Sequence, residues 1–236
     1  KSETRVGEAL KGVPRDSYYL ATKVGRVLEP SDGAPAGQAI FENAPPFDPV
    51  FDFSYDGVMR SFEESLERLG LERVDILHIH DPDAHFEEAL KGAYPALDKL
   101  RSEGTIQAVS AGMNQWEMLA RFAREGDFDC FLLAGRYSLL DQSSLDELLP
   151  LCEKKNIGIM AGGTFNSGIL AKGSAPGAKY NYGDAPPEIL ERAKGLEEVA
   201  ARHQVSIKAA ASQFALAHPA VTTIIPGTRQ PDRGKE

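Results

Sequence analysis

Two side chains that can handle a proton lie where apolar stretches of the chain end. Lys23 closes the run YYLATK, and His80 closes the run VDILHIH. A nearby ammonium favours the ionised form of an acid, and an imidazole exchanges its proton near neutral pH. In an α/β barrel the C-terminal ends of the strands open onto the active-site face, so a Lys and a His delivered there from successive strands indicate acid–base chemistry.

The alternation of side chains along these two strands points both groups to the same opening. In the strand expected over 74–80, His78 and His80 share one face, with His80 at the mouth and His78 one layer deeper. In the strand expected over 17–23, Lys23 shares a face with Tyr19 and points to the same mouth. A histidine inside an apolar strand is more often a hydrogen-bonded core residue than a catalyst, and we expect this of His78.

Helices and short apolar strands alternate along the whole chain. We expect strands over 17–23, 74–80, 106–111, 128–134, 157–161 and 222–225, and helices over 54–69, 86–102, 115–124, 144–155, 186–202 and 206–217. Such strands are typical of a parallel sheet covered by helices. No GxGxxG motif follows the first strand, and polar groups recur at the end of strand after strand. The pattern therefore favours a (β/α)8 TIM barrel over a doubly wound sheet, although only six of the eight strands are visible.

Local signals support several of these elements, and two long loops interrupt them. Ser54 is a plausible cap and Gly70 a plausible stop for helix 54–69. Pro95 should kink helix 86–102 or mark a second start within it, and Ser206 should cap helix 206–217. Residues 26–53 are rich in Pro, Gly and Asp, which fits either a lid or substrate wall or a surface insertion. Residues 162–184 begin with glycines and small polar residues directly after a strand, a composition that suits a phosphate cradle.

Composition limits the classes of partner. The 236 residues are 42% hydrophobic and 26% charged, which suffices for one globular domain over 1–236. The net charge of −9, without a Lys- or Arg-rich run, argues against nucleic acid and anionic membranes as partners. No apolar stretch has the length of a membrane helix, and the first residues do not resemble a signal peptide. Cys130 and Cys152 lie in apolar runs that suit buried thiols, so we expect a cytoplasmic protein.

Four motifs occur in the order found in one known family. They are ATK at Lys23, RSFEESLERLGLERVDILHIHDPD, GMNQW and IIPGTRQPDR. Together they resemble the aldo-keto reductase superfamily, most closely its D-threo-aldose (L-fucose) 1-dehydrogenase and pyridoxal 4-dehydrogenase-like members. The resemblance implies an eight-stranded barrel that binds NAD or NADP without a Rossmann motif, and a catalytic tetrad of Asp, Tyr, Lys and His. By this resemblance Lys23 lowers the pKa of the tyrosine and His80 orients the reacting oxygen of the substrate.

The resemblance also places part of the tetrad outside this sequence. The opening KSETRVGEALKG is similar to the family segment that directly follows the catalytic tyrosine. We therefore expect that tyrosine and the aspartate of the preceding strand upstream of Lys1. We then expect the domain over 1–236 to be a barrel that lacks its first strands and part of its C-terminus.

Cofactor contacts are implied by the same motifs. Asn114 matches the asparagine that binds the nicotinamide carboxamide, but Ala134 and Gly162 stand where many members have a glutamine and an aromatic residue. Gly227 replaces a lysine that meets the ribose phosphate in NADP-preferring members, which favours NAD or dual use. The expected contacts are Asn114, Tyr137, Gly163, Thr164, Phe165, Asn166, Ser167, Gly227, Thr228, Arg229 and Arg233.

Asp81 directly follows His80, where many relatives place a tryptophan of the pocket wall. A carboxylate there can accept hydrogen bonds from hydroxyls, so it suits a polar, polyhydroxylated substrate. We expect an NAD(P)-dependent oxidoreductase that moves a hydride between nicotinamide and a polar carbonyl or lactol carbon, such as that of an aldose.

Two other functions remain open from the sequence. The His78-x-His80 pair could begin the metal site of a barrel hydrolase, but such a site needs further ligands. The remaining histidines lie in a loop (His85) or in and after helices (His203, His218). The chain could also be a cofactor-binding barrel without catalysis.

Overall fold

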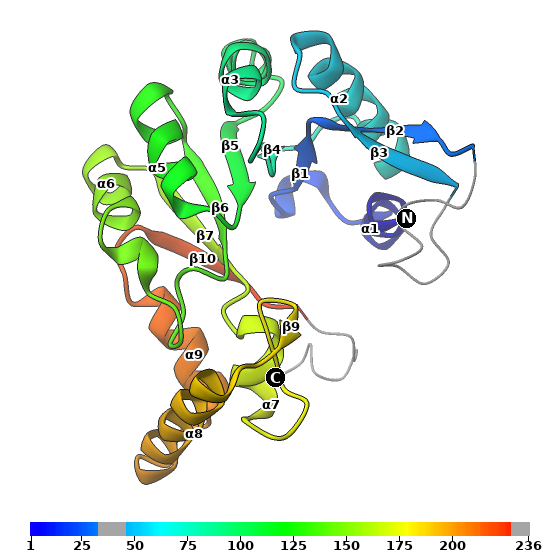
Figure 1. Cartoon of the computed structure of the whole chain (residues 1–236). Coiled ribbons are helices and arrows are strands. Elements are labelled where there is room, and N and C mark those ends of the chain that lie inside the picture. The colour runs from blue at the N-terminus through cyan, green and yellow to red at the C-terminus, as the bar shows by residue number, and fades with distance from the viewer. Residues whose placement is uncertain (33–45, 228–236) are drawn as a thin grey trace. The chain divides into compact units, whose positions relative to one another are not determined.

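The computed structural model describes residues 1–32 and 46–227, and the chain divides into two compact units (Figure 1). Unit 1 contains Lys1–Gly112 and Glu125–Asp129, and unit 2 contains Met113–Arg124 and Cys130–Glu236. Among the described residues, no helix is long and apolar enough to cross a membrane.

Unit 1 is built on three parallel strands with β4 in the middle. They are β1 (Ala21–Val24), β4 (Ile76–His80) and β5 (Ala108–Met113). Lys23 pairs in register with His78, which in turn pairs with Ser110, so these three residues form one row across the sheet. The core of the strands is apolar, and Leu77 and Ile79 are fully buried. The helical segments of the unit are α1 (Ser2–Leu10), η1 (Arg15–Ser17), α2 (Tyr55–Leu69), α3 (Phe86–Glu88), the π-helical η3 (Ala89–Ala93) and α4 (Tyr94–Ser102).

The expected end signals of the helices in unit 1 are confirmed. The Ser54 hydroxyl accepts a hydrogen bond from the Gly57 amide at 3.0 Å and so caps α2. Gly70 ends the helix in the left-handed conformation, with φ of 64°. Pro95 lies in the first turn of α4, directly after a π-helical segment, so it marks a second helix start.

The first strand is shorter than expected. Residues 15–17 form a 3-10 turn, in which Arg15 donates to the Tyr18 carbonyl and to the Asp75 carboxylate. The same carboxylate accepts from the Leu20 amide at 2.6 Å, which holds the chain just before β1 begins. Tyr19 therefore lies outside the strand and is 79% exposed, so the expectation that it shares a strand face with Lys23 was wrong.

The long loop after β1 contains an antiparallel ribbon. Its strands are β2 (Arg26–Pro30) and β3 (Phe47–Phe51), with Arg26 paired to Phe51; residues 33–45 lie outside the described part. Gly25 makes the turn from β1 into the ribbon with φ of 94°. A Cβ atom there would lie 2.2 Å from the Phe53 ring, so this close turn requires glycine.

Unit 2 repeats the parallel arrangement with β7 in the middle. Its parallel strands are β6 (Cys130–Ala134), β7 (Gly158–Gly162) and β10 (Val221–Ile225). The Ser206 hydroxyl accepts a hydrogen bond from the Ala209 amide and so caps the helix that begins at Ile207, as expected. The other elements are α5 (Trp116–Glu125), η4 (Ser143–Leu145), α6 (Leu148–Lys155), η5 (Asn166–Gly168), α7 (Ile169–Lys172), the short hairpin β8 (Lys179–Tyr180) and β9 (Gly183–Asp184), α8 (Pro187–Arg202) and α9 (Ile207–Leu216).

Candidate active site

Lys23 and His80 lie at the C-terminal ends of β1 and β4, which we call the mouth of unit 1. Lys23 is exposed, and it pairs with His78 in the sheet, one layer below His80. After burial, its ammonium is the next largest cause that lowers the pKa of both histidines. The positive charge of Lys23 therefore acts on the histidines at the end of β4. The alternation of the two strands predicted that Lys23 and His80 point to the same mouth.

His78 is a core histidine, as expected from its depth in the strand. It is 3% exposed, and its Nδ1 lies 2.7 Å from the Ser110 hydroxyl on β5. Burial, and then Lys23, lower its pKa to about 3, so the ring is neutral near pH 7. No group of three His, Cys, Asp or Glu side chains that could hold a metal ion occurs in residues 1–32 and 46–227.

His80 is more accessible, with 26% of its side chain exposed. Burial is the largest cause that lowers its pKa to about 3, followed by the charges of Lys23 and Arg26. Its Nε2 lies 3.3 Å from Asp81 Oδ2, and this carboxylate would by itself favour the imidazolium. We conclude that desolvation and the two cations outweigh it, because the carboxylate also pairs with Arg26 at 2.7 Å. A neutral His80 has one ring N–H to donate and one nitrogen to accept.

Asp81 joins the mouth to the ribbon. Its backbone has φ of 42° and its amide donates to the Gly112 carbonyl, which turns the chain sharply after β4. Burial raises the pKa of its carboxyl, and the Arg26 charge opposes that rise. A third of the side chain is exposed, so hydroxyls can still approach it. Its contact with substrate stays a prediction.

The expected carboxamide contact, Asn114, lies in unit 2. Its Nδ2 donates to the Ala134 carbonyl at 2.8 Å, which orients the side-chain amide. The Oδ1 atom of the same amide then points away from Ala134 and can accept a hydrogen bond from an N–H group of a ligand.

The loop after β7 turns sharply through several residues with positive φ. Gly163, Asn166, Ser167 and Gly168 all have positive φ, between 44° and 102°. Within the described residues, the amides of Gly163, Thr164 and Phe165 have no recorded hydrogen-bond acceptor. The buried Thr164 hydroxyl likewise lacks a partner there. Of these three residues only Gly163 has a positive φ. Three successive unpaired amides suit the pyrophosphate of a nicotinamide dinucleotide, so these residues fit the expected cofactor.

Two side chains of this loop have internal partners instead. The Asn166 side chain is buried, accepts from the Ser138 hydroxyl and donates to the Gly135 carbonyl at 3.4 Å. The Ser167 hydroxyl accepts from the Tyr182 amide at 2.9 Å. Their side chains therefore hold the loop in shape. The Asn166 amide does the same, because it donates to the Gly163 carbonyl at 2.8 Å. The sequence reasoning missed Ser138, although its place soon after a strand end is a usable signal.

The remaining predicted cofactor contacts differ in their surroundings. Tyr137 is 5% exposed, and its ring centroid lies 5.1 Å from that of Phe214 and 5.9 Å from that of His218. This packing does not support a cofactor contact, which stays a prediction. Gly227 is exposed, and nothing lies within 4 Å of a Cβ atom placed there. Thr228, Arg229 and Arg233 lie outside the described residues.

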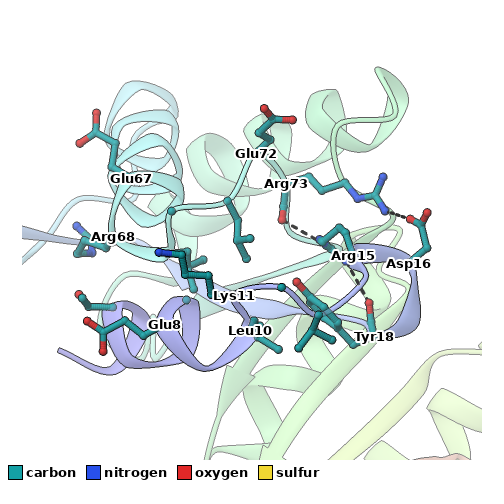
Figure 2. A pocket seen from close by; sticks show the side chains of 17 residues that line it. Glu8, Leu10, Lys11, Arg15, Asp16, Tyr18, Glu67, Arg68, Glu72 and Arg73 are labelled. Carbon is teal, nitrogen blue, oxygen red and sulfur yellow. Dashed lines mark hydrogen bonds and ion pairs between the residues drawn. The ribbon is translucent and has the colours of Figure 1, made fainter.

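Unit 1 also has a pocket of about 800 Å³, lined by residues that precede β1 and β4 in the chain (Figure 2). Its lining includes Lys11 directly after α1, Arg15 and Tyr18 before β1, and Arg73 before β4. Arg15 donates to the Tyr18 and Arg73 carbonyls across it, as the dashed lines in the figure mark. None of the predicted site residues lines this pocket.

Comparison with known proteins identifies the class. The model of the aldo/keto reductase family matches residues 1–236. The chain is 38% identical to pyridoxal 4-dehydrogenase of Microbacterium luteolum, over 99% of this chain and 73% of that protein. It is also 38% identical to D-threo-aldose 1-dehydrogenase of a Pseudomonas species, over 98% of this chain and 72% of that protein.

Solved structures share the fold. An aldo-keto reductase of Bacillus halodurans in its holo form superposes with a TM-score of 0.74 at 24% identity, over 99% of this chain and 70% of that one. The glycerol dehydrogenase of Gluconobacter oxydans gives a TM-score of 0.72 at 23% identity, over 98% and 69%. The expected α/β barrel fold is thereby confirmed.

Fold and relatives together define an NAD(P)-dependent oxidoreductase that acts on small carbonyl or sugar substrates. The chain belongs to the aldo/keto reductase family.

Proposed function

We propose that the substrate is a polyhydroxylated one, an aldose that is oxidised at its lactol carbon. The observation that carries this proposal is the mouth of unit 1, where neutral His80 lies beside the partly exposed Asp81 and Arg26. A carboxylate and a guanidinium offer acceptors and donors to neighbouring hydroxyls, whereas a tryptophan at position 81 would offer an apolar wall. The D-threo-aldose 1-dehydrogenase relative supports the same substrate class.

The proposal assigns a role to each group at the mouth. His80 donates its ring N–H to the oxygen on the reacting carbon and so orients it. Lys23 stabilises the phenolate of the acid–base tyrosine that the family resemblance implies. The tyrosine takes the proton of the lactol hydroxyl as the hydride leaves the carbon.

NAD or NADP supplies the hydride acceptor when it is bound. In our proposal Asn114 holds the carboxamide, and the amides of Gly163, Thr164 and Phe165 meet the pyrophosphate, supported by the positive φ of Gly163 and by the absence of other described acceptors. Gly227 offers no charge for a ribose phosphate, which supports NAD or dual use. Thr228, Arg229 and Arg233 complete the proposed contacts.

Turnover of the natural full-length protein tests the proposal. Reduction of NAD and NADP is followed by absorbance with L-fucose, other aldoses, pyridoxal and glycerol. We expect aldoses to be the best substrates, and Lys23→Met and His80→Gln to lower kcat at least about 100-fold. Equal or better turnover of pyridoxal would overturn the substrate assignment. Cofactor binding without any turnover would favour the non-catalytic alternative, and loss of activity with a chelator would favour the metal-dependent one.

Two broader points belong to the same proposal. We infer that residues 1–236 form part of one barrel domain, which the family match over the whole chain supports. We also propose a cytoplasmic location, which the motif resemblance and the acidic composition support. Fluorescence microscopy of the tagged natural protein would check the location.

A further inference from the structure

Arg26 connects the ribbon to the mouth through a short chain of contacts. The tight turn at Gly25 places Arg26 at the start of β2, and its Nη2 lies 2.7 Å from Asp81 Oδ2. The same carboxylate oxygen lies 3.3 Å from His80 Nε2. The Phe51 ring on β3 packs under the guanidinium, whose carbon lies 4.9 Å from the ring centroid. The guanidinium is therefore held on two sides.

We propose that Arg26 is a positioning residue, which holds the Asp81 carboxylate beside Nε2 of His80 and so fixes His80 in its neutral Nε2–H tautomer. A carboxylate at this distance repels a lone pair on Nε2 and attracts an N–H there. At 3.3 Å the contact is long for a charge-assisted hydrogen bond, so the N–H can still turn to a second acceptor. That the second acceptor is the substrate oxygen rests on the proposed function.

The need for Arg26 follows from the charge of Asp81. A carboxylate that faced the imidazole alone would also favour its protonation. The guanidinium offsets this pull, because its own charge lowers the pKa of His80 and its hydrogen bond occupies the carboxylate. The pair thus orients the ring without ionising it.

The other titratable groups around His80 act on its pKa, or on that of Asp81, in known directions. Lys23 on β1 and His78 on β4 lower the pKa of His80, and burial lowers it most. Asp83, in the loop after β4, acts on Asp81 and raises the pKa of that carboxyl. Arg26 has a distinct place beside these groups, because it contacts both Asp81 and Phe51 of the ribbon.

A purely structural role is the alternative, in which Arg26 only fastens the ribbon. The tautomer and pKa of His80 separate the two roles, and both are read by NMR of the natural full-length protein with ¹⁵N-labelled histidine. Arg26→Met keeps the apolar stem but removes the charge, and Arg26→Lys restores a charge. Arg60→Met is the matched control, because Arg60 is half exposed and pairs with Glu29 and Glu64 instead.

We expect His80 of the native protein to stay neutral, as the Nε2–H tautomer, from pH 7 to pH 4, because its pKa is lowered to about 3. In Arg26→Met its pKa should rise by about one pH unit or more, because one cation is lost and the carboxylate acts alone. Arg26→Lys should recover most of the low value, and Arg60→Met should not change it. In the double variant Arg26→Met with Asp81→Asn the pKa of His80 should fall again, and both neutral tautomers of His80 should be populated. A role of Arg26 in fastening the ribbon alone would not produce this result.

Kinetics on the same variants supply the second readout. The acid limb of kcat/KM in Arg26→Met should move to higher pH by the same amount as the pKa of His80, with a larger effect on kcat than on KM. An unchanged tautomer and pKa in Arg26→Met would overturn the inference. If no aldose is turned over but the tautomer and pKa of His80 still change in Arg26→Met, the proposed substrate is wrong and the positioning role stands.

Discussion

At the scale of single residues, His78 and His80 differ in role because they differ in depth by one layer of the sheet. His78 is buried in the sheet with its Nδ1 beside the Ser110 hydroxyl, while His80 reaches the mouth beside Asp81. The alternation of the strand predicted both positions from the sequence. It could not predict Arg26, because the contact with Asp81 joins residues 55 positions apart through a turn that only the folded chain makes.

The pair of His78 and Ser110 carries a prediction about stability. Ser110→Ala leaves Nδ1 of a buried imidazole without its partner, so we expect the free energy of unfolding to fall by about 1–3 kcal/mol. Urea unfolding followed by circular dichroism measures the loss. Ser102→Ala is the control, because that hydroxyl is exposed at the end of α4 and should change the value by less than about 0.5 kcal/mol. Equal losses in both variants would contradict the assigned role.

At the scale of elements, the sequence predicted those whose ends carry strong signals. The caps at Ser54 and Ser206 and the glycine stop at Gly70 all act as expected. The helix α1 was missed because none of its residues is buried, so it lacks a clear apolar face. The ribbon of β2 and β3 was missed because its sequence reads as a loop of Pro, Gly and Asp, although its strands pair through the backbone.

The packing of α1 on α2 depends on the absence of a side chain at Gly7. A Cβ atom there would lie 1.9 Å from the Leu69 carbonyl oxygen, so Gly7→Ala must push the two helices apart. We expect a loss of about 1–3 kcal/mol in the free energy of unfolding. In the exposed middle of α8, Gly195 has nothing within 4 Å of such an atom. Gly195→Ala should therefore raise the free energy of unfolding by about 0.5–1 kcal/mol. A change in unfolding temperature of the same sign in both variants would refute this view.

At the scale of the whole molecule, the order of motifs identified the family where composition and periodicity could not. The periodicity predicted six parallel strands, and three are found in each unit. The side-chain partners of Asn166 and Ser167 were beyond prediction, because they depend on Ser138 and Tyr182, which are distant in sequence. A pattern shows which residues belong to a loop, and only the folded loop shows which of their groups remain for a ligand.

The buried histidines also affect the pH dependence of stability. In the folded chain the pKa of His78 and that of His80 are each about 3, below the ordinary value of 6.5. The unfolded chain therefore binds more protons between these values, so stability is complete above about pH 6.5 and is lost as the pH falls toward 3. Each histidine contributes a slope of up to about 1.4 kcal/mol per pH unit. The midpoint of urea unfolding, measured from pH 7 to pH 4, should decrease accordingly.

The variant His78→Asn separates this contribution from general acid sensitivity. An amide can keep a hydrogen bond to Ser110 but does not titrate, so the slope from His78 should disappear while that from His80 remains. We expect the dependence of the unfolding free energy on pH between 6 and 4 to become shallower by about 1 kcal/mol per pH unit. A variant that is less stable at every pH by the same amount would show that the buried imidazole is not the source of the acid sensitivity.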